Sequence, residues 1–409
     1  MSFQTGLSGL NASSQSLDVI GNNIANANTV GMKASRAEFA DLVASSIGAG
    51  GSSSKAGIGT AVAAISQEFS QGNVSITGNA LDVAINGGGF FQLTKTDGST
   101  AYSRDGQFKL DKDGNIITNT GSFLMGYPTD ATGATTSFTT QKLKVPTGAP
   151  IAAKQSGTIT AEFNLDARAP IATPTTSASQ YGTSLIAYDS QGVEIPVSLY
   201  FVKSAADTWD AYDNLATAQA AITSGTPAGQ VATLQFGTNG ALTAPTTAQP
   251  ISITSTNANI GAFNVNLDMT KATQFGVNFA ISNLSQDGYT SGEFTGLSID
   301  GKGVITTRYS NGQTMKDGGM VALADFRNVQ GLNPTGSGEY QDTYKSGAAV
   351  MGKPTVGRFG ELRSGALEDS NVDLTAELVD MMTAQRNYQA NAQTIKTQDQ
   401  IMSTLVNLR

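Results

Sequence analysis

Residues 371–409 read NVDLTAELVDMMTAQRNYQANAQTIKTQDQIMSTLVNLR, and the rest of the chain is organised around this segment. It contains neither Gly nor Pro, and most of its residues favour or tolerate a helix. Apolar residues recur at every seventh position and at neighbouring steps of three or four: Leu374, Leu378, Met381, Tyr388, Ile395, Met402 and Leu405. The spacing predicts a coiled-coil-like helix of about five heptads. At 1.5 Å per residue it is about 58 Å long, too long for one compact domain.

The surface beside this apolar seam is unusual for a coiled coil, because it carries amides in place of Glu and Lys. They are Gln385, Asn387, Gln389, Asn391, Gln393, Gln398, Gln400 and Asn407. Amides donate and accept at once, so they can pair with a neighbouring copy in more than one register. Ser370 is expected to cap the helix start, with Asp373 three residues later. The alternative for this segment alone is an ordinary long helix on a globular domain.

The N-terminus shows the same seven-residue period. The stripe consists of Phe3, Leu7, Leu10, Leu17, Ile20 and Ile24, and Asp18 is the only charged side chain up to residue 32. Gly6, Gly9 and Gly21 interrupt the helix pattern, each at a cost of about 1 kcal/mol relative to Ala. A helix this weak needs a partner against its stripe. The C-terminal helix is the expected partner, so the ends of the chain should meet and the middle should be inserted between them.

Composition excludes several classes of function. The chain has 409 residues, no Cys, no His, a net charge of −8 and only 14 % charged residues. Without His or Cys, the common nucleophilic triads and zinc sites are absent, and the negative charge argues against a nucleic-acid surface. We therefore expect no enzyme, no metal and no cofactor. No apolar run is long enough to span a membrane, and the start lacks the features of a Sec signal.

The middle of the chain changes from helical to strand periodicity. The spacing of Phe39 and Leu42 predicts a second short helix, and residues 48–54 a flexible loop. From about residue 73 the period is two, with a tight turn at 86–89 and a hairpin at Asp113-Gly114. Residues 57–62, 86–89 and 111–115 superficially resemble a dinucleotide fingerprint, a phosphate loop and a calcium loop. Each lacks residues that the motif requires.

Residues from about 128 to 286 are rich in Thr, Ala, Ser and Pro, with strands predicted at 183–188, 197–202 and 262–267. They predict one or two antiparallel β domains with a hydroxyl-rich surface. A segment that resembles the first β region resumes near residue 287. The two flanks therefore fit one β domain interrupted by an outer domain.

Three stretches resemble the signatures of the bacterial flagellar rod and hook protein family. They are LDVIGNNIAN at 17–26, LDVAINGGGFF at 81–91, and GALEDSNVDL at 365–374 followed by ELV and QRNY. The matching residues are Asp18, Asn22, Asn23, Asn26, Asp82, Gly87, Gly89, Phe90, Phe91, Ser370, Asn371, Val372, Gln385 and Arg386. These motifs cover about a quarter of the chain, and together they are highly specific.

The resemblance implies a mainly β fold with long paired terminal helices and nested domains. The expected segments are a terminal helical core (1–30 and 366–409), an extended linker (31–72), an inner β domain (73–147 and 288–365) and an outer β domain (148–287). The helices would line a hollow, curved tube that transmits torque, formed by copies of the chain outside the cell. Type III export without a cleavable signal would carry the subunit there. Other implied partners are the distal rod protein, the hook cap protein, the hook–filament junction protein and the export apparatus.

Two alternatives remain at this point. Within the family, a distal rod subunit shares both termini but generally lacks a large outer domain, whereas about 140 residues occupy that place here. Outside the family, a Thr/Ser/Gly-rich β chain could be an extracellular adhesin or a carboxylate glycosidase. An adhesin needs an anchor or a cleaved signal. A glycosidase needs an aromatic-lined cleft with two carboxylates, and the chain has one Trp and 7 % aromatic residues.

Overall fold

The computed structural model describes residues 2–43, 57–148, 150–224, 228–255 and 260–407. The chain forms two compact units. Unit 1 contains Met1–Gly148, Gly296–Arg308 and Thr314–Arg409, and unit 2 contains Ala149–Thr295 and Tyr309–Gln313. The fold is mainly β with long terminal helices, so the predicted fold class is confirmed. Unit 2 is inserted into unit 1, whose sequence is therefore discontinuous.

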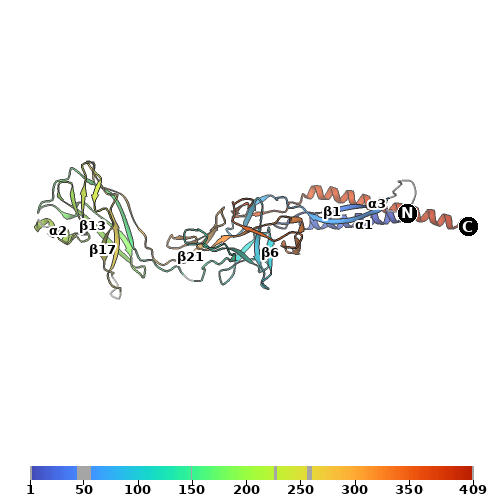
Figure 1. Ribbon diagram of the computed structural model, residues 1–409, viewed down its shortest axis with the longest axis horizontal. Coiled ribbons are helices and arrows are strands. Elements are labelled where there is room, and N and C mark those ends of the chain that lie inside the picture. The colour runs from blue at the N-terminus through green and yellow to red at the C-terminus, as the bar shows by residue number, and fades with distance from the viewer. Residues whose placement is uncertain (1, 44–56, 149, 225–227, 256–259, 408–409) are drawn as a thin grey trace. The chain divides into compact units, whose positions relative to one another are not determined.

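The two terminal helices belong to unit 1. Helix α1 covers Ser2–Ala25 and helix α3 covers Leu374–Asn407. They lie side by side and antiparallel, so that α1 begins and α3 ends at the same end of the unit (Figure 1). The ends of the chain therefore meet, as the matching periods predict. In the part of the chain that the structure describes, no helix has the length and apolar character needed to cross a membrane.

A long antiparallel hairpin follows α1 and contacts it, made of β1 (Ser35–Val43) and β2 (Gly57–Gln67). The prediction of a short helix at Phe39 and Leu42 is wrong, because both lie in β1. Phe39 pairs with Val62 across the hairpin. The β-branched residues of β2 supply a strand partner, and this pairing overrides the local three-residue spacing. The predicted loop at 48–54 lies outside the described residues.

The β part of unit 1 is built on a sheet with the order β26-β27-β6-β5-β9-β8-β7, from which β10, β24, β25 and β28 branch. Two further pairs are β29-β4 and β3-β30. Their bounds are β3 Val74–Ile76, β4 Val83–Asn86, β5 Phe90–Thr94, β6 Thr100–Ser103, β7 Phe108–Leu110, β8 Ile116–Thr118, β9 Phe123–Tyr127, β10 Gln141–Lys142, β24 Met320–Val321, β25 Leu323–Asp325, β26 Asn333–Gly336, β27 Glu339–Gln341, β28 Val350–Gly352, β29 Glu361–Ser364 and β30 Ala366–Glu368. The hairpin predicted at Asp113-Gly114 is confirmed as β7-β8. A three-stranded sheet contains β21 Phe294–Ile299, β22 Ile305–Tyr309 and β23 Thr314–Met315.

Unit 2 contains two five-stranded sheets. One has the order β17-β18-β11-β19, with β20 also paired to β11, and the other has the order β12-β13-β14-β15-β16. Pairing is antiparallel except that β11 runs parallel to β18 and β19. The bounds are β11 Thr158–Asp166, β12 Gly182–Tyr188, β13 Glu194–Ala205, β14 Thr208–Tyr212, β15 Ala232–Phe236, β16 Leu242–Ala244, β17 Gln249–Ile253, β18 Phe263–Asp268, β19 Thr273–Phe275 and β20 Ala280–Gln286, with helix α2 at Leu215–Ser224. The strands predicted at 183–188, 197–202 and 262–267 are present.

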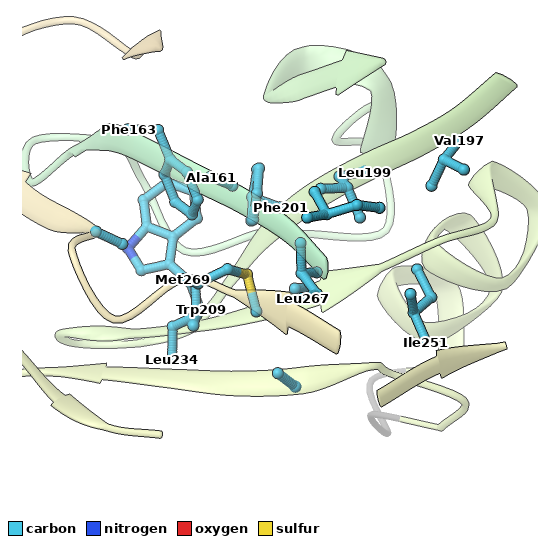
Figure 2. Close-up of a cluster of buried hydrophobic side chains, with 14 of the residues drawn as sticks. Ala161, Phe163, Val197, Leu199, Phe201, Trp209, Leu234, Ile251, Leu267 and Met269 are labelled. Atoms are coloured by element: carbon cyan, nitrogen blue, oxygen red, sulfur yellow. The ribbon is translucent and has the colours of Figure 1, made fainter. Parts of the chain in front are cut away.

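The core of unit 2 lies between its sheets and contains the one Trp of the chain. Trp209 is fully buried, and its indole nitrogen donates a hydrogen bond to the side-chain oxygen of Gln274 at 3.1 Å. Phe163 and Phe201 pack against each other at 4.4 Å between ring centroids. Figure 2 shows these rings beside Leu199, Leu267 and Met269 from facing strands. The single Trp therefore belongs to a packed core and does not line a carbohydrate cleft.

Candidate functional site

The register of the terminal helices is fixed by three contacts. The backbone of Gly6 lies against Ile395, and the backbone of Gly9 lies against the amide of Asn391. Near the other end of the pair, Asn23 donates a hydrogen bond to Glu377 at 2.8 Å. In each pair the two residue numbers add to about 400. The two helices therefore stay in contact from residue 6 of α1 to residue 23 in one antiparallel register.

Glycine on α1 allows the close approach of α3. A Cβ atom on Gly9 would lie 2.9 Å from the side-chain nitrogen of Asn391, and one on Gly6 would lie 3.1 Å from Ile395 Cγ1. A Cβ atom on Gly21 would have no other atom within 4 Å, so Gly21 does not contribute to the close approach. The first two glycines weaken the isolated helix, but they let the two backbones approach where a larger side chain would separate them.

The sequence predicts that the apolar stripes of α1 and α3 face each other, but in the structure they do so only in part. On α1, Ile20 is buried, whereas Leu10, Leu17 and Ile24 are half-buried and Phe3 and Leu7 are exposed. On α3, Met381 and Ile395 are half-buried, whereas Leu374, Leu378, Tyr388 and Met402 are exposed. The side chain of Leu405 lies outside the described residues. Small residues of α1 face α3, so much of both stripes stays open to solvent. The role of these stripes in polymerisation remains a prediction.

The start of α3 is capped by Asp373. Its carboxylate accepts hydrogen bonds from the backbone N–H groups of Thr375 and Ala376 at 2.8 and 3.2 Å. The prediction of Ser370 as the cap is therefore wrong. The Ser370 hydroxyl instead accepts from the N–H of Val372, in the turn before the helix. The cap shifts by three residues because the chain from Ala366 to Glu368 is held in strand β30.

Asn23 joins three elements of unit 1 from a buried position. Its amide donates to the carbonyl of Ser35 and to the carboxylate of Glu377, both at 2.8 Å. Its amide oxygen accepts from the N–H of Ser35 at 2.9 Å. Burial raises the pKa of Glu377, the bond from Asn23 opposes this effect, and Asp380 and Glu68 raise the pKa further. One side chain thereby fixes the end of α1 to β1 and to α3.

The strongest electrostatic feature is a buried ion triad of Lys33, Glu368 and Arg104. The ammonium of Lys33 lies 2.6 Å from one carboxylate oxygen of Glu368, and the guanidinium of Arg104 lies 3.1 Å from the other. The side chains of Lys33 and Glu368 are fully buried. Lys33 also donates to the carbonyl of Ser70 at 2.7 Å, and the N–H of Gly72 donates to Glu368 at 3.0 Å. The triad fastens the segment after α1 to the β part of unit 1 and to the segment before α3.

Burial lowers the pKa of Lys33, while the hydrogen bond and the charge of Glu368 raise it and Arg104 lowers it. Arg104 also lies over the ring of Phe90, 5.3 Å from its centroid. The sequence alone did not predict a site at Lys33, Arg104 or Glu368. The available signal was that Lys33 is the first basic residue of the chain and follows a helix of almost no charge.

The other motif residues hold turns and the β core. Asp82 accepts from Thr77 and Asn79, and Gly87 has φ of 119° and packs against Gly360. The expected tight turn is thus present. Phe90 and Phe91 are buried in the β core, and Gly89 is buried beside them. Asn26 donates hydrogen bonds to Asn22 on α1, and Asn371 forms hydrogen bonds with residues 34, 68 and 70. The last three motif residues are exposed on the helices: Asp18, Gln385 and Arg386.

Among the residues that the structure describes, no group of three or more Asp or Glu side chains is arranged to hold a metal ion. A groove of about 850 Å³ in unit 1 lies beside α1 and is lined by residues of α1, β2 and the β26-β27 hairpin. Its lining mixes amide, hydroxyl and apolar side chains with the carboxylates of Asp18 and Glu339, which suits contact with another chain better than chemistry on a small molecule.

Four family descriptions match the chain in order. "Flagella basal body rod protein" matches residues 3–33, and "Flagellar hook protein FlgE/F/G D1 domain" matches 84–161. "Flagellar basal body protein FlaE D2 domain" matches 164–289, and "Flagellar basal body rod FlgEFG protein C-terminal" matches 363–408. The first and last of these cover the two terminal helices.

Relatives match over the full length. The chain is 42 % identical to the flagellar hook protein FlgE of Escherichia coli (strain K12) and 41 % identical to that of Salmonella typhimurium, with 100 % of each chain covered. It is 34 % identical to the hook protein FlgE of Rhizobium meliloti, over 100 % of this chain and 98 % of the relative. The crystal structure of Helicobacter pylori flagellar hook protein FlgE2 shares the fold, with a TM-score of 0.50, 13 % identity and coverage of 72 % of this chain and 100 % of that one.

Proposed function

The chain belongs to the flagellar hook protein family, and from this premise we propose that its copies polymerise through the terminal helices into a short, curved, hollow tube. It is a structural subunit of the flagellar hook. One observation carries the polymer proposal: α1 and α3 pair through small residues and leave large apolar side chains exposed on both helices. In a chain with packed β cores, such exposed apolar surface is expected to be covered by another molecule.

The tube would act as a flexible joint that transmits torque between rod and filament. The helix pairs would form its inner wall, and the four segments predicted from the sequence would stack outward from them. The buried ion triad supports this arrangement of an inner helical wall and outer β segments, because it fastens the helical end of unit 1 to its β part. The outer β domain has a hydroxyl-rich surface and little charge, and contacts between such surfaces are weak enough to slide as the tube bends.

We further propose that the subunit works outside the cell after type III export, without catalytic activity. Its further partners would be the distal rod protein, the hook cap protein, the hook–filament junction protein and the export apparatus. A distal rod subunit is disfavoured by the full-length match to hook proteins.

Polymerisation of the purified chain tests the central proposal. Concentrated protein is sedimented and examined by negative-stain microscopy, and hollow tubes of uniform diameter are the expected result. A variant that lacks residues 374–407 should stay in the supernatant. A wild-type chain that remains monomeric at every concentration and salt condition would contradict self-assembly through this region.

A further inference from the structure

Two single charges stand out on the terminal helices. Asp18 is the only charged residue from 2 to 32, and Arg386 is the only basic residue from 374 to 395. Both side chains are exposed. Among the residues that the structure describes, neither makes a hydrogen bond or an ion pair within the chain. Each is therefore available to a partner of opposite charge.

The positions of the two residues prevent them from meeting within one chain. Asp18 is nine residues after Gly9, and Arg386 is nine residues before Ile395. Gly9 and Ile395 both lie in the contact between α1 and α3. Nine residues correspond to about two and a half helical turns, which leads to the opposite face of each helix. Asp18 thus faces away from α3, and Arg386 faces away from α1.

The surroundings of Asp18 form a receptive surface. Asp18 is part of the wall of the 850 Å³ groove, whose apolar side chains include Val19, Val62 and Ile65. Ile65 is 57 % exposed although it lies on the groove side of β2. We call this surface the α1 groove. It offers apolar contact with the exposed carboxylate of Asp18 on its wall, whereas the other carboxylate of the lining, Glu339, is buried and paired with Lys95.

The surroundings of Arg386 form a matching projection. Leu378, Met382 and Arg386 are four residues apart, so they follow one line along α3. The first two side chains are 51 % and 53 % exposed. We call this line the α3 ridge. An apolar ridge that ends in a cation is complementary to an apolar groove with an anion on its wall.

The two surfaces lie at nearly the same level of the helix pair. In the antiparallel register, Asp18 is level with about residue 382, so it is offset from Arg386 by about four residues, or roughly 6 Å. A copy placed beside the first can therefore insert its α3 ridge without a large axial shift. Because groove and ridge are different surfaces, one copy of a pair keeps a free ridge and the other keeps a free groove. Repetition of such a contact produces a ring or a helix.

We infer that the α3 ridge of one copy docks in the α1 groove of a laterally adjacent copy, with Arg386 paired to Asp18 across the contact. This inference rests on the proposed function and names the surfaces that would form the wall of the tube. The ion pair sets the partner and the register, because like charges brought together at this contact would repel in a partly desolvated site.

Charge reversal tests the pairing. Asp18→Arg places two cations in every contact, and Arg386→Asp places two anions there. Each single variant should raise the concentration needed for sedimentable polymer at least about tenfold, which corresponds to roughly 1.4 kcal/mol per contact. The double variant Asp18→Arg/Arg386→Asp restores opposite charges in every contact and should polymerise at close to the wild-type concentration.

Mixing the two single variants tests whether the contact is between copies. In an alternating polymer, the cation introduced at position 18 of one variant would face the anion introduced at position 386 of the other. The unchanged Asp18 and Arg386 would face each other at the next contact. At a concentration at which neither variant polymerises alone, an equimolar mixture should therefore polymerise. A folding defect within each chain would not be repaired by mixing. Lys112→Asp makes the same change in net charge as Arg386→Asp on an exposed turn of unit 1, and it should polymerise like the wild type.

The outcomes separate this inference from the proposed function. Wild-type tubes together with unimpaired tubes from both single variants would overturn the pairing and leave the polymer proposal standing. The same holds if the mixture and the double variant stay as defective as the single variants. Failure of the wild type itself to polymerise would instead overturn the proposed function. Circular dichroism and thermal unfolding of each variant verify that the β cores stay folded.

Discussion

Lys33 and Glu368 are 335 residues apart in the sequence, yet the ammonium of one lies 2.6 Å from the carboxylate of the other, and both side chains are fully buried. Arg104 makes the charge balance of the site positive. The site therefore depends on its single carboxylate. A buried pair of this kind adds little stability over an apolar core, but removal of one partner leaves an uncompensated charge.

Glu368→Gln should destabilise unit 1 by about 3–5 kcal/mol, because two cations then lose their buried counter-charge. Denaturant unfolding should show the loss in the transition of unit 1 and not in that of unit 2. Glu38→Gln removes an ion pair with Arg36 in which both side chains are largely exposed, and it should leave both transitions unchanged. Equal stability of Glu368→Gln and wild type would mean that water reaches the triad.

Glu377→Gln should change the pH dependence of stability. Burial raises the pKa of Glu377 in the folded chain above its ordinary value of 4.5. The folded state then binds more protons than the unfolded state just above pH 4.5, so this group's contribution to stability falls as the pH rises through that interval.

The glutamine variant keeps an acceptor for Asn23 and does not titrate. Its stability relative to wild type should therefore be higher at about pH 7 than at about pH 4, as measured by paired denaturant titrations in which the other groups cancel. The same difference at both pH values would show that Glu377 does not titrate abnormally.

Gly9→Leu should separate the terminal helices, because even a Cβ at this position approaches Asn391 to 2.9 Å. The expected result is loss of polymer in sedimentation, with the β transitions retained. Gly21→Ala is the matched control, since nothing lies within 4 Å of its Cβ. It should stabilise α1 by roughly 0.5–1 kcal/mol through helix propensity alone. If Gly9→Leu polymerises like the wild type, the close contact between α1 and α3 does not persist in the tube.

Ile395→Asp should abolish tube formation with little effect on the thermal unfolding of the β cores. Ile395 packs on Gly6, so a carboxylate there would enter the helix contact without a cationic partner. Gln398→Glu adds a charge on the same helix, near but off the apolar stripe, and should be much milder. Sedimentation of the two variants beside wild type measures the difference, and equal yields would contradict a role for this contact in assembly.

Much of the architecture was predictable from the sequence because it depends on periodicity. The seven-residue repeat of Leu374, Met381 and Tyr388 determined a long C-terminal helix, and the same repeat from Phe3 determined its partner. Alternation and turn residues determined the hairpin at Asp113-Gly114 and several strands of unit 2. Short motifs such as residues 17–26 and 81–91 identified the family. These signals are local, so a single sequence is enough to detect them.

Which residues contact one another depends on the tertiary structure. A heptad stripe indicates which side of a helix is apolar but not that Gly6 and Gly9, beside the stripe, contact α3. Phe39 lies in a strand because β2 supplies the pairing groups, and Asp373 replaces Ser370 as the cap because β30 holds the preceding chain. Lys33, Arg104 and Glu368 are separated by long stretches of sequence, so their charges became a site only when folding removed them from water and brought them together.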